Sequence, residues 1–176
     1  MKLCTKTGRI GNKPYVLLLL FFFSLCFTAP LFALPVNAPA PNFTLATLDG
    51  KKISLSDYRG KMVILKLGTT WCPGCRDQDK ELLKIDDMIK DAGIVLIQVF
   101  LDDPVEEVRI YQREHVMKSP VVSLLGDQKV LRDYGVYAIP RLIILSAEQK
   151  VLSDATGMTA SQIKAQILLK DKKVLH

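Results

Sequence analysis

Two cysteines, Cys72 and Cys75, are separated by two residues in the segment Trp-Cys-Pro-Gly-Cys at 71–75. An apolar run at 62–65 precedes them and a segment with helical spacing at 76–90 follows, so the pair is predicted at a strand-to-helix junction. One helical turn brings two such sulfurs within bonding distance, and the positive end of the helix favours ionisation of the leading thiol. This pattern predicts dithiol–disulfide exchange, in which the Cys72 thiolate attacks a disulfide and Cys75 resolves the mixed disulfide.

The first 34 residues are predicted to be a targeting segment outside the fold. Basic residues up to Lys13 lead into an apolar run at 15–27, and Ala33 is a candidate cleavage position. Residues 15–34 also reach the roughly 20 that span a bilayer, so a cleaved signal peptide and a retained membrane anchor are both open. In either case the basic end stays cytoplasmic, and the rest is exported to the periplasm or the outer face of the cytoplasmic membrane.

The remaining chain is predicted to hold one domain. Residues 35–41 are rich in proline and alanine and are expected to form an extended linker, and residues 42–176 form the domain. The formal charge of +6 overstates how basic this domain is, because four of the 24 basic residues precede residue 14 and all 18 acidic residues follow residue 48. The nearly balanced remainder indicates a solvated surface and no nucleic-acid-binding patch.

Export makes the number of cysteines informative. After residue 34 only Cys72 and Cys75 remain, so the domain has no cysteines for structural disulfides beyond this short pair. The alternative to a catalytic pair is a static surface disulfide. A zinc site needs about four ligands, and one cysteine pair with His115 and His176 far away in the sequence does not supply them.

The elements around the motif predict an α/β fold with a mixed sheet. A hairpin is expected at 42–54 around an Asp-Gly turn, and strands at 61–67, 94–101, 121–125, 142–145 and 151–152. Helices are expected from Cys72 to residue 90, from an Asp102 or Asp103 cap to His115, at 127–134, and after Thr159 or Ser161. Strands that alternate with helices indicate a sheet covered by helices, and the closing hairpin makes it mixed.

Four segments resemble the thioredoxin-like thiol–disulfide oxidoreductases of the TlpA/ResA type. They are Ala-Pro-Asn-Phe-Thr-Leu at 40–45, Leu-Ser-Asp-Tyr-Arg-Gly-Lys at 55–61, Thr-Trp-Cys-Pro-Gly-Cys-Arg at 70–76 and Tyr-Gly-Val-Tyr-Ala-Ile-Pro at 134–140. The resemblance covers residues 40–170. It implies a thioredoxin fold with an N-terminal hairpin and a central βα insertion, and an exported or membrane-tethered enzyme that reduces disulfide-bonded proteins. It further implies no metal or organic cofactor, and electrons supplied by a membrane thiol transporter of the DsbD/CcdA kind.

The resemblance also implies roles for individual residues. Cys72 is the attacking thiol and Cys75 the resolving one, Pro73 and Gly74 separate them at the start of the helix, and Trp71 shields the pair. Pro140 is expected to be a cis-proline that faces the disulfide. It would expose the backbone of Ile139 as a short strand edge on which a substrate strand can pair.

The sequence departs from this family at positions that could tune the cysteines. Lys66 stands six residues before Cys72, where thioredoxins place a buried acid or asparagine, and Gln78 stands where a glutamate is common. A buried lysine would favour a nearby thiolate, whereas the alternative is that Lys66 reaches the surface and has no chemical role. Gly68 leaves space beside the motif. Arg141 is expected to be solvated or to bind an acidic substrate.

Three other activities are alternatives to disulfide reduction. The Pro-Gly dipeptide does not decide direction, so a disulfide oxidase or isomerase stays open. A thiol peroxidase is a second alternative, because residues 40–45 resemble peroxiredoxins and residues 69–72 carry a faint Thr-x-x-Cys pattern. A copper-binding maturation factor is the least favoured, because it wants a three-residue gap between cysteines and a positioned histidine, and His115 is expected away from the cleft.

Overall fold

The structure, a computed structural model, describes residues 33–174 of the chain, with side chains described up to residue 169. The segment predicted to be a signal peptide or anchor, at 1–34, therefore lies almost wholly outside the described residues. Within the part that is described, no helix is both long and apolar enough to cross a bilayer.

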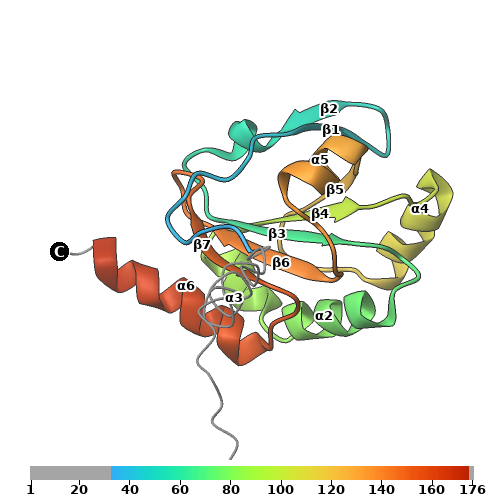
Figure 1. Ribbon diagram of the computed structural model, residues 1–176. Coiled ribbons are helices and arrows are strands. Elements are labelled where there is room, and N and C mark those ends of the chain that lie inside the picture. The colour runs from blue at the N-terminus through green and yellow to red at the C-terminus, as the bar shows by residue number, and fades with distance from the viewer. Residues whose placement is uncertain (1–32, 175–176) are drawn as a thin grey trace, which may run out of the picture. The chain divides into compact units, whose positions relative to one another are not determined.

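A seven-stranded mixed sheet forms the centre of the domain (Figure 1), in the order β2-β1-β5-β4-β3-β6-β7. The strand before the cysteines, β3, pairs in parallel with β4 on one side and antiparallel with β6 on the other. All residues of β3 and β4 are buried, as expected for strands covered on both faces. The strands are β1 Thr44–Thr47, β2 Lys52–Ser54, β3 Val63–Gly68, β4 Val95–Phe100, β5 Val121–Leu125, β6 Arg141–Leu145 and β7 Val151–Ala155.

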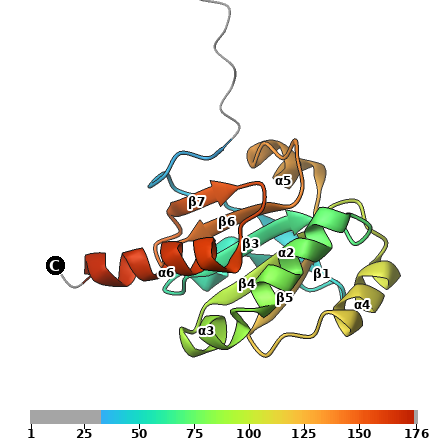
Figure 2. The same ribbon diagram turned by 90° about the horizontal axis from the view of Figure 1, so that it is seen from below.

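Helices cover both faces of this sheet. Seen from below in Figure 2, α2 (Pro73–Leu83), α3 (Asp86–Asp91) and α6 (Ala160–Val174) lie on one face. The opposite face carries α5 (Gln128–Asp133) and the short 3₁₀ helix η1 (Leu55–Tyr58), as Figure 1 shows. In chain order, α4 (Val105–Glu114) and β5 follow β4 and precede α5, and this pair fits the central βα insertion that the resemblance implied. The thioredoxin fold inferred from the sequence is confirmed.

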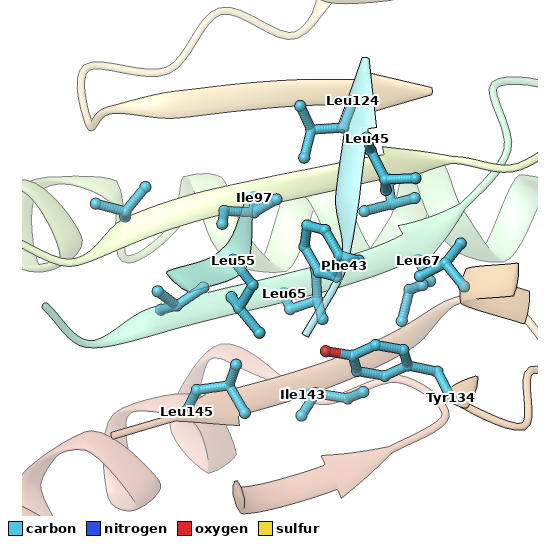
Figure 3. Close-up of a cluster of buried hydrophobic side chains, with 14 of the residues drawn as sticks. Phe43, Leu45, Leu55, Leu65, Leu67, Ile97, Leu124, Tyr134, Ile143 and Leu145 are labelled. Carbon is cyan, nitrogen blue, oxygen red and sulfur yellow. The ribbon is translucent and has the colours of Figure 1, made fainter. Parts of the chain in front are cut away.

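Two apolar cores hold the layers together. On the α5 face, Phe43 and Leu55 from the N-terminal hairpin region pack with Tyr134 and the inward side chains of β3, β4 and β6 (Figure 3). On the other face, Leu82, Ile89 and Ile163 bring α2, α3 and α6 onto the sheet. Both faces of β3 are therefore fixed by packing, and the strand forms a rigid support directly before the cysteines.

The single helix expected from Cys72 to residue 90 is wrong, because the structure breaks it into α2 and α3. At the break the Ile85 N–H donates to the Leu82 carbonyl at 3.0 Å, which tightens the last turn of α2. The break places the Asp86 carboxylate against the loop before β5, where it accepts from the Lys118 N–H at 2.6 Å and the Ser119 N–H at 3.0 Å. The Asp86 carboxylate thus binds the loop before β5 at a point where the apolar spacing of the sequence predicts an unbroken helix.

Residues 35–41, expected to be an extended linker, are hydrogen-bonded to the domain. The Asn37 N–H donates to the Val151 carbonyl at 2.8 Å, and the Val151 N–H donates to the Ala38 carbonyl at 2.9 Å. The Leu34 N–H donates to the Asp154 carboxylate at 2.6 Å, and Leu34 and Ala40 pack against the core. The segment is extended, as its prolines predict, but it is part of the domain from residue 34 onward.

Candidate active site

The two cysteines meet at the start of α2, directly after β3. Cys72 is the N-cap residue of α2 and Pro73 occupies the first helical position, where its missing N–H leaves no bond unmade. The Cys72 Sγ accepts a hydrogen bond from the Cys75 N–H at 3.3 Å. Both thiols are free, and Cys72 is 7 % exposed whereas Cys75 is 0 % exposed. A substrate can therefore reach Cys72 first, which fits the order of attack predicted from the sequence.

Gly68 makes room for the buried sulfur. A Cβ at this position would lie 2.7 Å from the Cys75 Sγ, closer than real contacts allow. Burial raises the pKa of the Cys75 thiol to about 12, and its hydrogen bond with Cys72 acts in the same direction. The Thr69 backbone and the Lys66 charge lower it in part. Cys75 is therefore a protonated thiol at neutral pH.

We expect the reduced protein to lose stability relative to its disulfide form as the pH rises from about 9 to about 12. The unfolded chain ionises Cys75 near the ordinary value of 9.0, whereas the folded thiol keeps its proton up to about 12. The folded state thus binds more protons in this window, and the free energy of unfolding falls by at most about 1.4 kcal/mol per pH unit.

Denaturant unfolding of both redox forms, between about pH 8 and 11, checks this expectation. The disulfide form is the control, because Tyr111 and Tyr134, whose pKa values burial also raises, are present in both forms. If the two forms lose stability in parallel over this range, the Cys75 thiol is not the group that titrates.

The loop before β6 faces the cysteines. Its Ile139–Pro140 peptide is cis, as the resemblance implied. The Ile139 carbonyl lies 4.0 Å from the Cys72 Sγ. A Cβ on Gly74 would come within 3.2 Å of Pro140 Cδ, so the absence of a side chain at Gly74 lets the loop approach the helix start. The structure thus brings Cys72, Gly74, Ile139 and Pro140 together.

Lys66 does not reach the surface, so the alternative interpretation of a surface lysine is wrong. Its side chain points from β3 toward α2, is only 3 % exposed as a residue, and forms an ion pair with Asp79. The Asp79 carboxylate also accepts from Tyr111 Oη and, at 3.3 Å, from the Gln98 amide. A buried acid is therefore present after all, but it comes from α2, four residues after Cys75, rather than from β3.

Sequence reasoning missed Asp79 because its neighbourhood is uniformly polar. Residues 76–81 read Arg-Asp-Gln-Asp-Lys-Glu, a run typical of a solvated helix face. The available signal was the spacing: Asp79 lies four residues from Cys75 and seven from Cys72, on the face of α2 that carries the resolving cysteine. An unmatched lysine in a strand that is otherwise apolar should have prompted a search for its partner.

Gln78 is buried, and both ends of its side-chain amide bond to Met158. Its amide donates to the Met158 carbonyl at 3.0 Å and accepts from the Met158 N–H at 2.7 Å. Both of its polar ends thus hold the loop between β7 and α6. Its contacts give it a structural task, and no bond joins it to either sulfur.

Arg141 is buried, so the expectation of a solvated or substrate-binding arginine is wrong. Its guanidinium pairs with the Asp154 carboxylate at 2.6 and 2.8 Å and donates to the carbonyls of Tyr134 and Gly135. These bonds tie the 134–140 loop to β7. Arg141 thereby supports the shape of the loop that carries Pro140.

Hydrogen bonds that were not predicted from the sequence hold Thr70, two residues before Cys72, in place. The Asp103 carboxylate accepts from the Thr70 N–H at 3.1 and 3.2 Å and from the Thr70 hydroxyl at 2.7 Å, while Arg76 Nε donates to the Thr70 carbonyl at 3.1 Å. The expectation that Asp102 or Asp103 caps α4 is therefore wrong, because Pro104 is the N-cap residue. Trp71 follows Thr70 and is 68 % exposed at the rim of the site.

His115 is the C-cap residue of α4. Its ring stacks on Tyr111 with 4.1 Å between centroids, and its Nδ1 lies 2.9 Å from the Tyr111 carbonyl oxygen. Among residues 33–174, no three histidine, cysteine or acidic side chains are grouped so that they could hold a metal ion.

Comparison with known proteins points to the same chemistry. The AhpC/TSA family matches residues 36–154. The chain is 34 % identical over 128 residues to the thiol-disulfide oxidoreductase ResA of Bacillus subtilis strain 168, covering 72 % of this chain and 71 % of that one. It is 29 % identical over 132 residues to ResA of Bacillus thuringiensis subsp. konkukian, covering 75 % and 74 %.

Solved structures share the fold. The thioredoxin domain of a thiol-disulfide oxidoreductase from Bacteroides vulgatus superposes with a TM-score of 0.65 at 24 % identity, covering 82 % of this chain and all of that one. A thiol:disulfide interchange protein of the thioredoxin family from Chlorobium tepidum gives 0.65 at 21 % identity, covering 78 % and 98 %.

Proposed function

Because this chain belongs to the AhpC/TSA family and is a thioredoxin-like thiol–disulfide oxidoreductase of the TlpA/ResA type, we propose that it is an exported reductase of protein disulfides. The observation that supports this proposal is the pair of free thiols at the start of α2, with Cys72 7 % exposed and Cys75 0 % exposed. The reductive direction is what the resemblance to the TlpA/ResA type implies.

The reaction proceeds by two exchanges at sulfur. The Cys72 thiolate attacks one sulfur of the substrate disulfide, forms a mixed disulfide and releases the other substrate sulfur, which takes up a proton. The Cys75 thiol then loses its proton and attacks the Cys72 sulfur, so that a Cys72–Cys75 disulfide forms and the second substrate thiol leaves. The substrate gains two electrons and two protons, and the protein loses them.

The second exchange needs help, because Cys75 holds its proton at neutral pH. Lys66 favours the Cys75 thiolate electrostatically, and the buried Asp79 fixes the Lys66 ammonium in place. We assign to Lys66 the tuning of the resolving thiol, Cys75, and to Asp79 the positioning of Lys66. Pro140 and the Ile139 backbone present the edge on which an extended substrate segment pairs beside Cys72.

The same proposal includes location and partners. The apolar segment at 15–34 directs export, as a signal peptide or as an anchor that keeps the domain at the outer face of the cytoplasmic membrane. A membrane thiol-transfer protein returns two electrons to the Cys72–Cys75 disulfide after each turnover. No bound cofactor is needed for either exchange.

Trapping with Cys75→Ser tests the function. This variant can form the mixed disulfide but cannot resolve it, so we expect covalent complexes with exported proteins that appear on non-reducing gels and disappear after reduction. The matched control, Cys72→Ser, should form none, because its remaining thiol is buried. If Cys75→Ser captures no protein while Cys72 still reacts with small disulfides, protein disulfides are not the substrates.

The direction of electron flow is tested by the reduction potential. We expect a value near that of thioredoxin, about −270 mV, together with insulin reduction. A potential as oxidising as about −120 mV would support an oxidase or isomerase instead. Peroxide consumption that outpaces insulin reduction would support a thiol peroxidase.

A further inference from the structure

A pocket of about 210 Å³ is lined by Thr70 and Trp71, the two residues directly before Cys72. One wall is the exposed face of α4, where Glu107, Ile110 and Glu114 follow one another at helical spacing above Tyr111. The other wall is Trp71. Because Trp71 is joined directly to Cys72, whatever occupies this pocket lies next to the attacked disulfide.

The pocket carries net negative charge, because two glutamates and one arginine line it. Glu107 and Glu114 are both exposed, and within the described part of the chain neither carboxylate has an ion-pair or hydrogen-bond partner. The one cation that lines the pocket, Arg76, forms no ion pair with either glutamate in the described part of the chain. Its Nε donates to the Thr70 carbonyl at 3.1 Å, and its guanidinium lies over the Tyr111 ring, 5.6 Å from the centroid. The two glutamates therefore face the open pocket.

The floor between the glutamates is apolar. Ile110 is 45 % exposed and lies between Glu107 and Glu114 along α4, opposite the indole of Trp71. Exposed apolar surface that is framed by charge is typical of a recognition site rather than of a solvated helix face. Lysine and arginine side chains match this arrangement, because their methylene stems cover apolar and aromatic surface while their charged ends reach carboxylates.

We propose that the Trp71–α4 pocket binds a lysine or arginine side chain close to the disulfide of the substrate protein, a specificity that rests on the proposed function. The basic side chain lays its stem across Ile110 and Trp71 and places its charge between Glu107 and Glu114. This contact selects basic disulfide segments for attack by Cys72 without taking part in the exchange of sulfur.

Matched peptide disulfides test the preference. Three peptides with the same cysteine pair carry lysine, glutamine or glutamate beside the cysteines, and kcat/KM for their reduction is compared. Trp71 is the sole tryptophan of the chain and gives a fluorescence signal at the pocket itself. We expect the lysine peptide to exceed the glutamate peptide by roughly three- to tenfold, with the ratio shrinking as salt is raised.

Variants locate the effect. Glu107→Gln with Glu114→Gln should bring the ratio close to one, and Glu107→Lys with Glu114→Lys should invert it. Glu106→Gln is the matched control, because Glu106 is an exposed acid on the same turn of α4 but does not line the pocket. This control should keep the full ratio.

The outcomes separate the two claims. If all three peptides are reduced at equal rates, or if the double glutamine variant keeps the wild-type ratio, the pocket does not select basic segments while the reductase function stands. If Glu106→Gln lowers the ratio as much as the double variant does, the effect is long-range charge and the pocket is again overturned. If no peptide is reduced, the proposed function itself fails.

Discussion

Replacing Lys66 by methionine is expected to destabilise the protein by about 3–5 kcal/mol, because the substitution leaves the Asp79 carboxylate buried without its cation. Tyr111 and Gln98 would still donate hydrogen bonds to Asp79, but neither carries a charge that offsets the burial of a carboxylate. Denaturant unfolding of the Cys72–Cys75 disulfide form isolates this effect from any change in the thiols.

The Asp79→Asn variant completes a double-mutant cycle for this ion pair. Lys66→Met combined with Asp79→Asn should recover most of the lost stability, because the asparagine carbonyl still accepts from Tyr111 and no charge stays buried. In both variants that lack Lys66, resolution of the mixed disulfide should slow, since the charge that favours the Cys75 thiolate is gone. A loss below about 1 kcal/mol for Lys66→Met would mean that water reaches Asp79.

Gly68→Ala is expected to lower stability by about 1–3 kcal/mol and to slow resolution, because the added methyl would sit 2.7 Å from the Cys75 sulfur. The backbone up to and including Gly68 is fixed by pairing with β4, so we expect the sulfur to move rather than the strand. Unfolding by denaturant gives the stability change. Rapid mixing with a peptide disulfide gives the rate at which Cys75 displaces it.

Cys75→Ala supplies the matched background for this test. The contact at 2.7 Å involves the sulfur alone, whereas the Cys75 Cβ is at an ordinary distance of 3.5 Å. Gly68→Ala should therefore cost much less in a chain that already carries Cys75→Ala. An equal cost in both backgrounds would place the strain in the backbone and not at the sulfur.

The elements that carry the site could be predicted because their signals are local. The apolar run of β3, the two cysteines and Pro73 specify a buried strand followed by a helix start, and each of these signals acts within a few residues. The Asp-Gly pair closed the hairpin as expected, with Gly50 at a φ of 80°. The resemblance added Pro140, whose partner Cys72 lies far away in the sequence.

The charged part of the site could not be predicted in the same way. Lys66 and Asp79, and likewise Arg141 and Asp154, are 13 residues apart and belong to different elements. Each of these four side chains taken alone is typical of a solvated surface, and only the packing of α2 on β3, or of β7 on β6, removes both partners from water. Whether a charged side chain can be buried depends on its partner, whereas secondary-structure propensity and hydrophobic periodicity describe each residue without its partner.

The same reasoning explains the misplaced helix boundaries. Asp86 begins α3 after the break, and Asp103 does not cap α4. Both carboxylates instead accept from backbone N–H groups of other segments, at Ser119 and Thr70. A carboxylate near a helix end predicts a cap when only the chain is considered. In the folded protein, each of these two carboxylates accepts hydrogen bonds from a segment that is distant in the sequence.

The pairing of residues 37–40 with the start of β7 has a consequence for how the protein is handled in solution. β7 is the outermost strand on its side of the sheet, and Asn37 and Ala38 occupy backbone groups at Val151 that would otherwise be free. An uncovered edge strand is a template for pairing with another chain. A fragment that begins after residue 41 should therefore aggregate more readily than one that keeps residues 33–41.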